Sequence, residues 1–122
     1  MDDVKIILSF LWVATMLVYF LGDVMRIFAG DFTPGEVEGK PMTPKIVFGM
    51  SIIMVIPIVM VVLSLIIDFP MSSWVNIIVA IFFIVFNLAG IKGYKAYDKF
   101  LIVVSLVFNI LTILYAWTRL PF

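Results

Sequence analysis

The residue best suited to chemistry in this chain is Asp23, a carboxylate near the end of a long apolar stretch. Tyr19 precedes it by four residues and Arg26 follows it by three, so a helix would place all three side chains on one face. A carboxylate within a membrane segment is costly and is by default a candidate functional group. Two interpretations remain open: Asp23 binds a proton or a ligand, or it pairs with Arg26 and is structural.

Polar side chains also recur on single faces of the other apolar stretches. Asn76 and Asn87 lie eleven residues apart, which is about three helical turns, and Ser105 and Asn109 lie four apart. In lipid, such faces turn toward neighbouring helices, where the polar groups can hydrogen-bond to one another and hold a bundle together. The alternative is a polar pocket. Its predicted lining is Tyr19, Asp23, Arg26, Asn87, Ser105 and Asn109.

The composition excludes several kinds of chemistry. Without Cys or His, the chain has no thiolate nucleophile, no imidazole base and no zinc site built on these ligands. The eight Met residues do not form the clusters that would favour copper(I), and the acidic residues of the first connector lack the spacing of a calcium loop. The balanced net charge provides no basic patch for nucleic acid. We therefore expect no catalytic residue, metal site or cofactor, and a protein that is not an enzyme.

The elements that must position these side chains are four apolar stretches. The mean hydropathy is +1.26, far above that of a soluble domain of 122 residues. Each stretch approaches the roughly 20 apolar residues that cross a bilayer. The sequence predicts one all-α polytopic membrane domain, an antiparallel up-down-up-down bundle of four transmembrane helices. The predicted spans are residues 4–28, 45–67, 74–91 and 99–118.

Several residues mark where these helices begin and end. Gly30 is expected to break the first helix, and Thr43 followed by Pro44 is typical of a helix start. We expect Ser73 to cap the third helix and Asp98 to cap the fourth. Pro57 lies at the centre of the second span and predicts a kink, because proline lacks a backbone N–H. The kink could mark a gate, but prolines are common in membrane helices, and we favour a static bend.

The distribution of positive residues predicts the orientation. Short connectors rich in Lys and Arg stay in the cytoplasm, so both termini should lie outside and the first and third connectors inside. The predicted cytoplasmic side holds Arg26, Lys40, Lys45, Lys92, Lys95 and Lys99, and the opposite side holds Lys5 and Arg119.

Runs in all four stretches resemble a family of small prokaryotic four-helix membrane proteins of unknown function. The resemblance covers nearly the whole chain and implies a helical bundle without implying an activity. In that family an acidic residue often precedes the Ile-Pro-Ile run, where this chain has Val55. The matching residues are Leu11-Trp12 with Asp23, Met54 to Ser64 around Ile56-Pro57-Ile58, Trp74-x-Asn76-Ile77-Ile78, and Tyr115-Ala116-Trp117.

Two functions follow as hypotheses. The first is a non-enzymatic bundle in the cell membrane that binds lipids, a small apolar ligand, a second copy of itself or a partner membrane protein. The second is a small proton-coupled transporter that uses Asp23 as its ionisable site. Four-helix drug exporters share only the plan of one acidic residue in the first helix, which is an architectural analogy.

Overall fold

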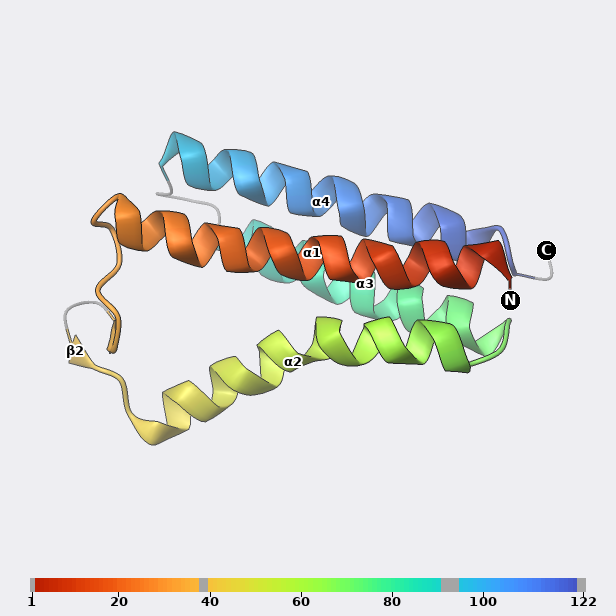
Figure 1. Ribbon diagram of the computed structural model, residues 1–122, viewed down its shortest axis with the longest axis horizontal. Coiled ribbons are helices and arrows are strands. Elements are labelled where there is room, and N and C mark those ends of the chain that lie inside the picture. The colour runs from red at the N-terminus through yellow and green to blue at the C-terminus, as the bar shows by residue number, and fades with distance from the viewer. Residues whose placement is uncertain (1, 38–39, 91–94, 121–122) are drawn as a thin grey trace.

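The computed structural model describes residues 2–37, 40–90 and 95–120. Its four helices are each long and apolar enough to cross a membrane, so the predicted all-α membrane bundle is confirmed. A short antiparallel hairpin, β1 and β2, lies in the first connector (Figure 1). The expectations that rest on Ile91 and Lys92 lie outside the described residues. The elements are α1 (Asp3–Phe28), β1 (Glu36–Val37), β2 (Lys40–Pro41), α2 (Pro44–Ile66), α3 (Met71–Ala89) and α4 (Ala96–Trp117).

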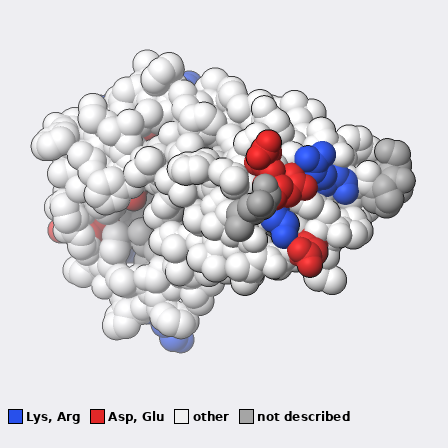
Figure 2. All heavy atoms as spheres, turned by 45° about the vertical axis from the view of Figure 1, so that its right-hand side comes forward, with Lys and Arg blue, Asp and Glu red and all other residues white. Residues whose placement is uncertain are grey.

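The outer surface of the bundle is apolar along most of its length. Large side chains such as Phe10, Phe20 and Ile78 are more than 60% exposed, which suits contact with lipid rather than water. Figure 2 shows charged side chains gathered toward the ends of the molecule with an uncharged zone between them. This pattern is that of a bundle whose middle lies in hydrocarbon.

The helices form a ring in which α1 packs against α2 and α4, and α3 packs against α4. At the end where the chain termini lie, the core consists of Val4, Leu8, Ile77, Ala116 and Leu120. A second cluster, deeper in the bundle, comprises Trp12, Met60, Ala80 and Phe83. Each cluster contains one buried alanine, Ala116 in the first and Ala80 in the second, and such small side chains let neighbouring helices approach closely.

One buried hydrogen-bond network joins three helices inside this core. The Trp12 indole N–H of α1 donates to Asn76 Oδ1 of α3 at 2.6 Å, and the Ser64 hydroxyl of α2 donates to the same oxygen at 3.2 Å. The Asn76 amide in turn donates to Ser72. Every polar atom of Asn76 is therefore partnered, which is the structural use of polar residues that a bundle in lipid favours.

Ion pairs close the end of the bundle that carries the termini. The Arg119 guanidinium donates two hydrogen bonds of 3.0 Å to the Asp2 carboxylate. The Lys5 ammonium contacts Asp68, in the turn between α2 and α3, at 2.8 Å. The guanidinium of Arg119 holds the pKa of Asp2 below its ordinary value, and Lys5 does the same for Asp68. At this end α1 is thus tied to both of its neighbours.

The opposite end of the bundle is splayed. Figure 1 shows α2 bending near its middle, so that its first half diverges from α1. No residue from 44 to 56 is buried, whereas Pro57, Met60 and Ser64 in the second half are. Pro57 has no N–H to donate to the carbonyl of Ile53, which is the local cause expected for such a bend. The seam between α2 and α3 is the least packed of the ring.

Helix starts were predicted with mixed success. The Thr43 side chain accepts from the Ile46 amide, and Pro44 occupies the first turn, as expected. The predicted cap at Ser73 is wrong, because α3 begins at Met71 and Ser73 is buried within it. The predicted cap at Asp98 is also wrong. Its carboxylate is drawn to Arg26 of α1, which offers a full positive charge where a backbone amide offers a partial one.

Candidate functional site

A cavity of about 980 Å³ lies at the splayed end of the bundle and is open on one side. It is bounded by the second half of α1, the first half of α2, the end of α3 and the start of α4. Its walls are largely apolar, and charged residues gather at its rim. The principal apolar lining residues are Val18, Met50, Met54, Phe83, Phe86, Leu101 and Ile102, and the polar ones are Tyr19, Asp23, Arg26, Asp31, Asn87, Lys95, Asp98 and Ser105.

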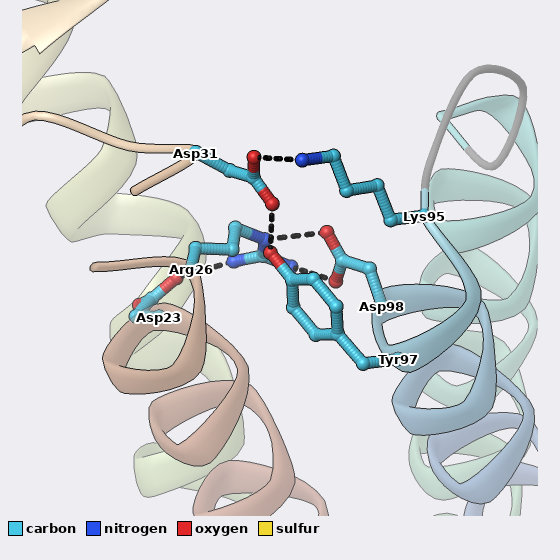
Figure 3. A network of polar contacts seen from close by, with 6 residues as sticks. All are labelled: Asp23, Arg26, Asp31, Lys95, Tyr97 and Asp98. Carbon is cyan, nitrogen blue, oxygen red and sulfur yellow. Dashed lines mark hydrogen bonds and ion pairs between the residues drawn. The ribbon is translucent and has the colours of Figure 1, made fainter. Parts of the chain in front are cut away.

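Arg26 is the centre of the charged rim (Figure 3). Its Nε and Nη2 atoms donate to the two oxygens of Asp98 on α4, each at 2.8 Å, and its Nη1 donates to Asp23 Oδ1 at 2.7 Å. The Asp98 side chain is only 7% exposed, whereas that of Asp23 is 59% exposed. The Arg26–Asp98 pair is therefore a fork-to-fork link between α1 and α4, and Asp23 is the more accessible carboxylate.

The Arg26 side chain folds back along α1 over Gly22. A Cβ atom at Gly22 would lie 3.4 Å from Arg26 Nη2, which is ordinary van der Waals contact. The guanidinium therefore packs close to the backbone of α1 on its way to Asp98 of α4.

A second charged link fastens the first connector to α4. The Asp31 carboxylate receives the Lys95 ammonium at one oxygen and the Tyr97 hydroxyl at the other (Figure 3). These hydrogen bonds lower the pKa of Asp31 from its ordinary value, the Lys95 contact having the larger effect. Asp31 therefore holds the first connector against α4.

Deeper in the cavity, Tyr19 connects α1 to α3. Its hydroxyl accepts from the Asn87 amide at 2.8 Å, and its ring lies 5.8 Å from that of Phe83. Asn109 is fully buried on α4, beside this hydroxyl, yet neither its amide nitrogen nor its amide oxygen forms a hydrogen bond of good geometry with a described residue. Polar groups that are buried without partners are rare and need an explanation.

The structure gathers five of the six residues predicted to form the pocket. Tyr19, Asp23, Arg26, Asn87 and Ser105 all line the cavity. The sixth, Asn109, lies buried behind the lining instead. Pro57 lies within α2, between its splayed and packed halves, outside the cavity lining.

Sequence reasoning did not place Asp98, Asp31 or Lys95 at this site. The available signal for Asp98 was Arg26 itself: a guanidinium at the end of an apolar helix needs a counter-charge on a facing element. Asp98 opens the apolar stretch that runs antiparallel to α3 and returns beside α1, so it was the suitable partner.

The lining residues define what the cavity can do chemically. The described residues contain no group of acidic side chains arranged to hold a metal ion. The cavity instead offers apolar walls, hydrogen-bonding groups at Tyr19 and Asn87, and a charged rim. Such a combination suits a molecule with an apolar body and a polar head.

Residues 1–121 match the model of a family described as a family of unknown function, DUF6326. No curated protein and no solved structure matches the chain.

Proposed function

From the premise that this chain belongs to the DUF6326 family, whose function is unknown, we propose that it is a non-enzymatic membrane protein that binds an amphiphilic molecule in the cavity at its splayed end. The apolar part of the ligand lies against α2 and α3. Its polar head lies at the rim formed by Asp23, Arg26 and Asp98.

The observation that carries this proposal is the combination of a large cavity with an apolar wall and a charged rim. Ligand pockets commonly measure about 300–1,000 Å³ and combine mostly apolar lining with a few polar groups. The cavity here has a comparable volume of about 980 Å³. Helical spans that only held one another together would close around their polar residues, as they do around Asn76.

A binding experiment with a neutral apolar fluorophore tests the proposal. N-phenyl-1-naphthylamine is titrated into the protein in lipid nanodiscs, and its fluorescence is compared with that in protein-free nanodiscs. We expect saturable binding that Met54→Trp weakens about tenfold or more, which is about 1.4 kcal/mol, because the larger side chain fills the cavity. Met71→Trp is the matched control, since Met71 is 65% exposed at the far end. Equal binding by both variants would show that the probe does not use the cavity.

The second candidate is a small proton-coupled transporter in which Asp23 carries the proton. The observation that favours it is the asymmetry of the bundle: at one end Lys5 ties α1 to the turn between α2 and α3, whereas at the other the first half of α2 has no buried residue and Asp23 lines the cavity. In this proposal the protein reconstituted in vesicles moves protons or substrate. Asp23→Asn abolishes the flux, and full flux in that variant would exclude the role of Asp23.

The orientation and contacts of the bundle complete the proposal. The termini lie outside the cell and the first and third connectors in the cytoplasm, as the Lys and Arg distribution supports. Membrane lipids surround the exposed apolar surface, and a second copy or a partner membrane protein is the other candidate contact. The splayed half of α2, residues 44–56, is the surface most open to either.

A further inference from the structure

We propose that the ligand of the cavity is a lipophilic organic cation whose positive charge is received by Asp23. This inference rests on the proposed binding function and specifies the charge of the ligand. Three features of the described residues support it independently: the net charge of the rim, the accessibility of one carboxylate, and the aromatic wall beside it.

The first feature is a surplus of one negative charge. The described residues that line the cavity include three carboxylates, those of Asp23, Asp31 and Asp98, and two cations, Arg26 and Lys95. Lys95 pairs with Asp31, while Arg26 is shared between Asp98 and Asp23. Because one guanidinium faces two carboxylates, the cluster carries a net charge of minus one before any ligand binds. A cation neutralises that charge, whereas an anion would double it.

The second feature locates the surplus charge on Asp23. Both oxygens of Asp98 accept hydrogen bonds from Arg26, and its side chain is buried. Asp23 accepts from Arg26 at Oδ1, and its Oδ2 accepts no hydrogen bond from the described residues. Its side chain is 59% exposed at the rim. Asp23 is therefore the carboxylate that a ligand can reach without breaking the link between α1 and α4.

The third feature is the aromatic character of the wall. Tyr19 and Phe86 are partly exposed rings in the cavity lining, and the fully buried Phe83 ring packs against both, with centroids 5.8 Å from Tyr19 and 6.4 Å from Phe86. The faces of such rings attract positive charge, and this attraction is stronger where water is excluded. A cavity that joins an accessible carboxylate to an aromatic wall is thus suited to a cation with an apolar body.

The test uses two ions of the same shape and opposite charge. Tetraphenylphosphonium and tetraphenylborate each compete with N-phenyl-1-naphthylamine for the protein in nanodiscs of zwitterionic lipid, and the ratio of their half-competing concentrations is measured. Controls without protein correct for the different partitioning of the two ions into lipid. We expect the phosphonium to compete at a concentration about tenfold or more lower than the borate.

Variants assign the selectivity to one carboxylate. Asp23→Asn is expected to lower the selectivity ratio about tenfold, whereas Asp23→Glu, which keeps the charge, retains it. Asp3→Asn is the matched control, because it removes the same charge from the closed end of the bundle. Circular dichroism of each variant establishes that it is folded.

Each result separates the two proposals. If the neutral probe binds and both ions compete equally, the cation inference is wrong while the binding function stands. If selectivity for the phosphonium survives Asp23→Asn, Asp23 does not receive the charge. If the neutral probe does not bind in the cavity at all, the binding function and the inference built on it both fail.

Discussion

Two fully buried asparagines differ in what surrounds them. Asn76 on α3 has hydrogen-bond partners for all its side-chain polar atoms, whereas Asn109 on α4 has none among the described residues. An unpartnered buried amide keeps its desolvation penalty, and replacing it by an apolar group of similar shape is close to neutral or stabilising. The same replacement at a partnered amide leaves its buried hydrogen-bond partners unsatisfied, which lowers the stability of the fold.

Leucine substitutions should therefore shift stability in opposite directions at these two positions. We expect Asn76→Leu to lower the free energy of unfolding by about 1–3 kcal/mol, because the Trp12 indole and the Ser64 hydroxyl lose their acceptor. Asn109→Leu should leave it unchanged or raise it. Thermal unfolding in detergent measures both. A large loss of stability in Asn109→Leu would mean that its amide is satisfied after all.

At the rim, Arg26→Lys tests whether the forked geometry matters or only the positive charge. A lysine ammonium cannot reproduce the two parallel hydrogen bonds to Asp98 together with the bond to Asp23. We expect a loss of about 1–3 kcal/mol in the free energy of unfolding. Lys5→Met, which breaks an exposed pair with Asp68, should have a much smaller effect. Equal losses would indicate that Arg26 acts only as a surface charge.

At the scale of residues, the sequence predicts which side chains lie on the same face of one helix. It does not predict which side chains of other helices they contact. The periodicity of α1 placed Tyr19, Asp23 and Arg26 on one face, and all three line the cavity. The choice of Asp98 over a helix cap depends on how closely α1 and α4 approach, which no local pattern contains. The contrast between Asn76 and Asn109 is likewise a matter of interhelical packing.

Among the elements, α2 is the one whose halves have different roles. Pro57→Ala restores a backbone N–H that can donate to the carbonyl of Ile53, so α2 should straighten. Continuation of its packed half would bring residues 44–56 closer to α1 and narrow the cavity (Figure 1). Distances between spin labels at Met50→Cys and Val18→Cys should shorten, and N-phenyl-1-naphthylamine should bind less tightly.

Pro44→Ala is the control for this experiment. Pro44 occupies the first position of α2, where a backbone N–H has no helical acceptor, so its replacement restores no bond. The label distance should not change. A Pro57→Ala variant with the parental distance would show that packing, not the missing hydrogen bond, sets the bend.

The first connector should detach from α4 in acid. The pKa of Asp31 is lowered in the folded state, so its contact with Lys95 stabilises the fold above the unfolded value of about 3.9 and is lost as the pH falls through the lower folded value. Carbon-13 NMR of labelled Asp carboxyls should show an Asp31 midpoint below 3.9. Lys95→Met should raise that midpoint, whereas Lys99→Met should not. An Asp31 midpoint that is unchanged in Lys95→Met would contradict the contact between the two side chains.

Elements are the scale at which the sequence was most informative. Hydropathy alone predicted four spanning helices, and Thr43 with Pro44 predicted where α2 begins. The start of α3 at Met71 was missed, because the Ser73 hydroxyl was assigned to a cap when it lies inside the helix. Serine favours caps only where the backbone is free to leave the helix, and in lipid a serine also serves as a small buried residue.

At the scale of the whole molecule, the orientation in the membrane can be tested directly. The chain contains no Cys, so single substitutions give unambiguous labels. We expect Met71→Cys to react with a membrane-impermeant maleimide on intact cells, and Lys40→Cys to react only after permeabilisation, because the positive connectors face the cytoplasm. The reverse pattern would invert the orientation.

The number of helices and their short connectors predict the order of the helices around the ring. They do not predict that the contacts between neighbouring helices are unequal. Two antiparallel hairpins predict four similar seams, whereas α2 and α3 touch least. The cause lies in where charges and kinks fall: ion pairs tie α1 to α4 at both ends, while the first half of α2 has no buried residue. The cavity lies where the first half of α2 diverges from the other helices.

The links between α1 and α4 also impose an order on how the protein is made. Arg26 enters the membrane with α1, but Asp98 is 72 residues further along the chain. At about 5–20 residues per second, the ribosome takes roughly 4–15 s to supply it. During that interval Asp23, three residues from Arg26, is the carboxylate at hand to neutralise the guanidinium. A chain interrupted before α4 leaves Arg26 without its bidentate partner and α1 without one of its two main neighbours.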